Sequence, residues 1–88
     1  MKKGPVSLTK SLSVEFAPYV NVNAVSPGWV NTDMNKDLPK DLIDAENAKT
    51  PLRRFAEPSE IAKPIVFLCS GDASYITGTM LEIHGGYQ

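Results

Sequence analysis

The sequence has one cysteine, no long apolar run and almost no net charge. Because Cys69 is the only cysteine among 88 residues, an intramolecular disulfide and a multi-cysteine metal site are excluded, which fits a reducing, cytoplasmic compartment. No apolar stretch approaches the roughly 20 residues that span a bilayer, and no signal-peptide core follows Met1, so we expect no membrane association. Nine basic and ten acidic residues form no basic stripe, which argues against nucleic acid as a partner.

Helix and strand signals are present in a clear order. A chain of 88 residues is one domain at most and buries only about 60 to 65% of its unfolded surface, so a small core is expected. Apolar spacing, strand alternation and Gly or Pro punctuation predict three helices and two strands. The predicted helices are residues 5–17, 37–49 and 57–70, and the predicted strands are residues 20–26 and 79–83.

The two predicted strands cannot form a complete sheet by themselves. Some fifty residues with two helices separate them, so they can pair in parallel, but a two-stranded parallel sheet leaves both faces and both edges uncovered. Val22, Val25, Leu81 and Ile83 would lack neighbours. We therefore expect residues 1–88 to be a single partial domain of a larger α/β protein, or to pair with another chain.

Two long stretches carry a family resemblance. They are "SLTKSLSVEFAPYVNVNAVSPGWVNTDM" and "PLRRFAEPSEIAKPIVFLCSGDASYITGTMLEIHGG", and together they closely resemble the C-terminal third of short-chain dehydrogenase/reductases. The combination of helix, "VN" strand, "PG" loop, "EIA" helix and "YITG…GG" tail is much more specific than any one of these elements. The resemblance implies the C-terminal part of a Rossmann-like, doubly wound parallel sheet that binds NAD(H) or NADP(H).

The turn "SPGWVNT" follows the first predicted strand, and ligands of doubly wound sheets lie beyond the carboxyl ends of the strands. Pro27 and Gly28 let the backbone turn sharply and approach a planar ring. The resemblance implies that the backbone of Val30 holds the nicotinamide carboxamide, that the Thr32 hydroxyl bonds the carboxamide or a phosphate, and that Trp29 walls the pocket. The structural alternative is a tight turn with Trp29 packed on the core.

Residues 34–50 correspond in the family to a lid over the substrate and the nicotinamide. Weak burial of this segment fits a movable lid, although its charges also suit an ordinary solvated face. The resemblance implies that Met34, together with Trp29, contacts a small carbonyl or alcohol substrate. Residues 58–70 and 80–83 resemble elements that make subunit contacts in this family, so a homo-oligomer is expected; internal packing is the alternative.

The family's catalytic residues are a Ser, a Tyr and a Lys four positions after the Tyr. The Tyr exchanges a proton with the substrate oxygen while hydride moves to or from the nicotinamide, and the Lys favours the phenolate. Counting back from "LTKSL" places the lysine at Lys2, so the Tyr falls before Met1. Neither Tyr19, Tyr75 nor Tyr87 has a Lys four residues later. The resemblance thus assigns Lys2 as catalytic but predicts no turnover by this chain alone.

The assignment of Lys2 has an alternative, because a lysine beside Lys3 is commonly just solvated and a one-residue shift would move the match. The Gly-rich turn that seats the pyrophosphate at a helix N-terminus is also absent from the sequence. The residue that separates NAD from NADP follows an earlier strand of this fold, so both cofactors stay open.

Three polar residues receive structural interpretations. His84 stands where the family often has an acidic residue, has no second ligand at metal spacing, and is interpreted as structural or exposed, so no metal site is predicted. Cys69 is expected to be a small buried hydrophobe, and Asn23 is expected to hold local backbone. The leading hypothesis is thus the truncated part of an NAD(P)-dependent carbonyl/alcohol oxidoreductase; the alternative is a non-catalytic association module derived from that fold.

Overall fold

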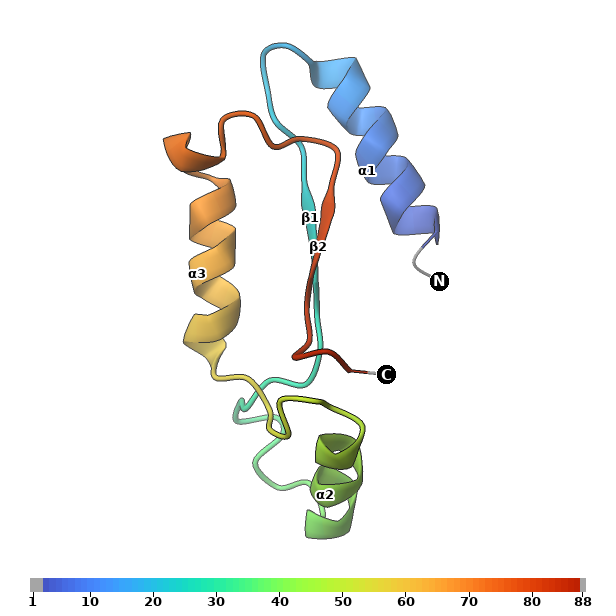
Figure 1. Ribbon diagram of the computed structural model, residues 1–88, viewed down its shortest axis with the longest axis vertical. Coiled ribbons are helices and arrows are strands. Elements are labelled where there is room, and N and C mark those ends of the chain that lie inside the picture. Colours follow the sequence, from blue (N-terminus) through green and yellow to red (C-terminus); the bar gives the residue numbers. More distant parts are fainter. Residues whose placement is uncertain (1–2, 88) are drawn as a thin grey trace.

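The computed structural model describes residues 3–87 and has the expected order of helix, strand, helix, helix, strand (Figure 1). Each predicted element is present, with boundaries that shift by a few residues. The elements are α1 (Lys3–Phe16), β1 (Ala24–Pro27), α2 (Lys40–Ala48), α3 (Pro58–Leu68), the 3-10 turn η1 (Gly71–Ala73) and β2 (Met80–Ile83).

The two strands pair in parallel, as predicted. Ala24 lies opposite Met80, and Pro27 lies opposite Ile83. In Figure 1, α1 and α3 flank this narrow sheet on opposite sides, and α2 lies beyond the end at which both strands finish. Residues that follow the two strands are therefore brought to one place, next to α2.

β1 begins at Ala24, four residues later than the predicted strand, because the preceding polar groups bond to a turn. The Asn23 side chain donates to the Ile76 carbonyl at 2.9 Å and accepts the Thr79 N–H at 3.1 Å. The N–H of Val22 donates to the Thr77 hydroxyl at 2.9 Å. These bonds replace a regular ladder, and Asn23 holds backbone as expected.

α1 faces the rest of the chain with small polar side chains. Thr9 and Ser13 are buried, and their hydroxyls donate to carbonyls of their own helix, those of Pro5 and Lys10. A Cβ at Gly78 would lie 2.8 Å from the Ser13 Oγ, so close approach selects these small residues. Apolar spacing predicted the helix correctly, although the apolar residues Leu8 and Val14 are exposed.

α3 begins with a capping box between Glu57 and Glu60 and with proline at its first position, both of which favour a helix N-terminus. Pro64 lies inside the helix. The prediction for Cys69 is wrong: this residue caps the C-terminus of α3 and is exposed. Its neighbours Val66 and Phe67 are also exposed.

The chain buries very little apolar surface. Within residues 3–87, Ala73 is the one apolar side chain that is fully buried, while Val14 is 77% and Val66 is 68% exposed. The Cα radius of gyration is 15.4 Å, compared with about 12 Å for a compact domain of this length. The helices and strands are thus arranged around apolar surface that the described residues do not cover. No helix in the described part of the chain is long and apolar enough to cross a bilayer.

Candidate functional site

A hollow of about 310 Å³ lies where both strands end, lined by Ser26, Pro27, Gly28, Trp29, His84 and Tyr87. Volumes of about 300 Å³ and above are typical of small-molecule sites. The end of β1 supplies Ser26 and Pro27, and the turn after it supplies Gly28 and Trp29. The C-terminal segment supplies His84 and Tyr87. The position agrees with the rule that ligands of such sheets lie beyond the carboxyl ends of the strands.

Glycine is required at position 28 because the segment after β2 approaches the backbone closely there. Its N–H donates to the Ile83 carbonyl at 2.9 Å. A Cβ at this position would lie 2.8 Å from the Cβ and 3.1 Å from the Cα of His84. The sequence suggested that glycine admits a planar ring at this turn; in the structure it admits the backbone of His84.

Trp29 is a half-buried wall of the hollow. Its indole stacks on the Phe55 ring, with centroids 5.3 Å apart and planes inclined by 14°. The indole N–H donates to the Glu46 Oε2 at 3.1 Å. Trp29 thus lines the hollow and is also packed on Phe55, while its role as a wall of a cofactor pocket stays a prediction.

Val30 lies in an extended segment that is pinned along one edge by Ala56. The N–H of Ala56 donates to the Trp29 carbonyl at 3.0 Å, and the Asn31 N–H donates to the Ala56 carbonyl at 2.7 Å. Because successive peptide groups of extended backbone point to opposite edges, the N–H and C=O of Val30 face away from Ala56. The outer edge therefore carries a donor and an acceptor side by side, the pair that a primary amide binds, and the acceptor is bonded in this structure by the Asn35 side chain and the Thr32 N–H.

The remaining predicted residues are not among those that line the hollow. Neither Val30 nor Thr32 lines it, and Thr32 is exposed. The Met34 side chain is 90% exposed and does not line the hollow, so its contact with a substrate stays a prediction. Lys2, predicted to be catalytic, lies outside residues 3–87.

Glu46 of α2 was not singled out from the sequence, yet it joins three segments. Its Oε2 accepts hydrogen bonds from the Trp29 indole and from the Tyr87 hydroxyl. The Tyr87 bond, then the Trp29 bond and the Lys49 charge, lower the pKa of Glu46 despite partial desolvation. The same bond raises the pKa of Tyr87. Both aromatic walls of the hollow are thus tied to α2 through one carboxylate oxygen.

We predict that Glu46→Ala moves the fluorescence emission of Trp29, the only tryptophan, to longer wavelength. Loss of the carboxylate removes the bond that holds the indole against α2, so the ring becomes more hydrated. The measurement is the emission spectrum of the 88-residue chain, with circular dichroism to check helix content. Asp44→Ala, at an exposed acid of the same helix, is the matched control. An unchanged spectrum for Glu46→Ala would argue against the clamp.

His84 has a structural role. Its Nδ1 accepts the Gly86 N–H at 3.1 Å, so the ring proton lies on Nε2, which is 3.0 Å from a Glu82 carboxylate oxygen. Its backbone meets Gly28, as described above. Among the described residues no group of three or more His, Cys, Asp or Glu side chains is arranged to hold a metal ion.

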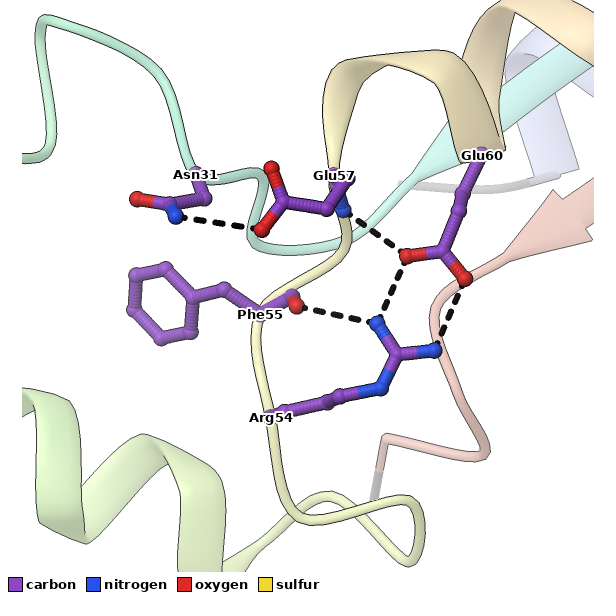
Figure 2. Close-up of polar contacts among 5 residues, drawn as sticks. All are labelled: Asn31, Arg54, Phe55, Glu57 and Glu60. Carbon is purple, nitrogen blue, oxygen red and sulfur yellow. Dashed lines mark hydrogen bonds and ion pairs between the residues drawn. The ribbon is translucent and has the colours of Figure 1, made fainter.

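The N-terminus of α3 is tied to the turn after β1 by a polar cluster (Figure 2). Arg54 donates to both carboxylate oxygens of Glu60, at 2.6 and 2.7 Å, and the Glu57 N–H donates to Glu60 at 2.9 Å. These bonds, that of Arg54 first, lower the pKa of Glu60 to about 2. The Asn31 side chain donates to Glu57 at 3.3 Å. The cluster thus fixes the strand-like segment that carries Val30.

Comparisons with known proteins agree with this geometry. The family model described as "Enoyl-(Acyl carrier protein) reductase" matches residues 1–88. The 3-oxoacyl-[acyl-carrier-protein] reductase FabG of Aquifex aeolicus is 45% identical over 86 residues, which are 97% of this chain and 35% of that protein.

Two solved structures from Brucella melitensis resemble the model. A short-chain dehydrogenase/reductase of the glucose/ribitol dehydrogenase type is 47% identical with a TM-score of 0.85, covering 97% of this chain and 35% of its own. A 3-oxoacyl-[acyl-carrier protein] reductase is 31% identical with a TM-score of 0.92, covering 98% and 32%. The chain thus spans about a third of the length of these proteins.

Proposed function

This chain belongs to the short-chain dehydrogenase/reductase family, and we propose from that premise that it forms the nicotinamide side of an NAD(P)-dependent oxidoreductase. The complete site would interconvert a carbonyl and an alcohol. One observation carries the proposal: the outer edge of Val30 presents a donor and an acceptor side by side. The nicotinamide carboxamide supplies the complementary groups, and the hollow beside Gly28 and Trp29 offers space for the ring.

The residues of this chain would bind and orient the cofactor. When bound, the nicotinamide supplies or accepts the hydride at the substrate carbon. Val30 would hold the carboxamide, Thr32 would bond the carboxamide or a phosphate, and Trp29 would close one side. α2 and Met34 belong to the segment proposed to cover the substrate.

Proton transfer requires a residue that this chain does not place at the site. In the proposal, Lys2 lowers the pKa of a tyrosine on preceding polypeptide, and that tyrosine exchanges the proton with the substrate oxygen. Tyr87 lines the hollow, but its hydroxyl donates to Glu46, which raises its pKa, the opposite of what the reaction needs. Tyr19 and Tyr75 are fully exposed or nearly so. We therefore propose that the 88 residues alone have no turnover.

The test is a hybrid protein in which this chain replaces the C-terminal third of the Aquifex aeolicus reductase. We expect the hybrid to bind NADH or NADPH in a calorimetric titration, and the isolated chain to bind neither, because the pyrophosphate turn lies on the added part. A folded hybrid that binds neither dinucleotide would count decisively against the proposal.

A second candidate, an association module that pairs with other subunits, is favoured by the uncovered apolar side chains of α3. Ile65, Val66 and Phe67 are all exposed, and patches of this kind commonly mark protein interfaces. Light scattering distinguishes the two functions: a defined dimer or tetramer of the isolated chain would favour the module. The hybrid is also proposed to be a homo-oligomer.

A further inference from the structure

The Val30 carbonyl already holds a carboxamide that belongs to this chain. Asn35 donates from its side-chain Nδ2 to the Val30 oxygen at 2.7 Å, within a partly buried contact. A side-chain amide of asparagine and the carboxamide of nicotinamide are the same functional group, a planar CONH₂ with two donor hydrogens and one acceptor oxygen. The contact shows that a primary amide fits this edge of the backbone.

The Val30 oxygen has no room for another donor while Asn35 is bound. A carbonyl oxygen has two lone pairs. One faces the Thr32 N–H at 2.9 Å and the other faces the Asn35 Nδ2. The Val30 N–H, by contrast, has no hydrogen-bond partner among residues 3–87. The donor half of the edge is thus open, and the acceptor half is filled.

We propose that Asn35 is an internal stand-in for the carboxamide of the nicotinamide cofactor, and that it must leave Val30 before the cofactor can bind there. This inference rests on the function proposed above. It adds a competitor within the chain: every binding event exchanges one amide for another at the Val30 oxygen. The measured affinity equals the intrinsic affinity multiplied by the fraction of molecules in which Asn35 has left that oxygen.

The position of Asn35 allows this exchange. It lies in the turn between the Val30 segment and α2, where its N–H donates to the Thr32 carbonyl at 2.9 Å and its carbonyl accepts the Leu38 N–H at 3.3 Å. The flanking side chains of Met34 and Lys36 are exposed. Rotation of the Asn35 side chain breaks the one hydrogen bond that it makes to the described residues. Because this turn leads into α2, cofactor entry is also linked to the start of the proposed lid.

The test compares Asn35→Ala with the parent hybrid in calorimetric titrations. One ligand is whichever of NADH and NADPH the parent binds, and the other is the ADP-ribose part of the same cofactor, which lacks the carboxamide. Removing the competitor should tighten binding of the whole dinucleotide about five-fold, the effect of about one net hydrogen bond. The affinity for the ADP-ribose part should not change. If Asn35 had only a structural role, its replacement would change the affinities for both ligands together.

Asn21→Ala is the matched control, because it also removes an asparagine amide bonded to a backbone carbonyl, that of Ser74 at 3.2 Å, at the other end of the strands. It should leave both affinities unchanged. If the parent hybrid binds the dinucleotide and Asn35→Ala binds it equally or more weakly, this inference is overturned and the proposed function stands. A folded parent that binds no dinucleotide would overturn both. If Asn35→Ala lowers the melting temperature, the same comparison is made in a hybrid with the 3-oxoacyl-[acyl-carrier protein] reductase of Brucella melitensis.

Discussion

In the hybrid, Lys2→Ala is expected to lower kcat/KM for carbonyl reduction by about 10²- to 10⁴-fold, the usual contribution of a positioned acid or base. The proposed role of Lys2 is to place an ammonium beside the catalytic tyrosine. Without that charge, the tyrosine pKa returns toward about 10 and its phenolate becomes rare near neutral pH. The measurement is steady-state NAD(P)H oxidation, followed across pH.

Lys3→Ala is the matched control, since it removes the same charge one residue later and should leave kcat/KM unchanged. This pair of variants also resolves the alternative of a one-residue shift in the resemblance. Loss of activity with Lys3→Ala, and not with Lys2→Ala, would move the catalytic position. Equal activity of both variants and the parent would remove the proposed lysine from the mechanism.

Gly28→Ala is expected to destabilise the hybrid by about 1 to 3 kcal/mol, the typical cost of forcing a methyl group into filled space. The new Cβ would lie 2.8 Å from the His84 Cβ and 3.1 Å from its Cα. Because one of these neighbours is backbone, the clash cannot be relieved by a side-chain rotation. Either the turn after β1 or the segment after β2 must move, so dinucleotide binding should weaken as well. Thermal unfolding measures the first effect and calorimetry measures the second.

Gly71→Ala provides the comparison for Gly28. No heavy atom lies within 4 Å of a Cβ built at Gly71, so this variant should unfold at the parent temperature and bind normally. An equal decrease in melting temperature for Gly28→Ala and Gly71→Ala would show that the loss of stability arises from glycine replacement in general. It would then contradict the tight contact between the two strand ends.

The order and type of the elements followed from local sequence signals. Apolar spacing, proline positions and strand alternation act over a few residues, so they predicted α1, α3 and the parallel strands. The burial of individual side chains could not be predicted from these local signals. Cys69 follows an apolar stretch but is exposed, because part of the apolar surface of α3 is left uncovered by the described residues. The uncovered sheet, in contrast, was foreseen from two strands that lacked neighbours.

The site could be predicted only in part, because its contacts join residues distant in sequence. The turn from Pro27 to Trp29 was recognisable from its position after a strand. Glu46 gave no signal, since it is one of several acids on a polar helix. Its partners Trp29 and Tyr87 lie 17 and 41 residues away. Asn35 likewise resembled any polar turn residue until the orientation of the Val30 carbonyl was known.

The central claim is that the outer edge of Val30 receives the nicotinamide carboxamide. The most direct measurement follows the backbone amide resonance of Val30 in the isotope-labelled hybrid during titration with NADH or NADPH. The account predicts a large change with the whole dinucleotide and little change with its ADP-ribose part, since only the former carries the carboxamide. Equal changes with both ligands, or tight dinucleotide binding without any change at Val30, would contradict it.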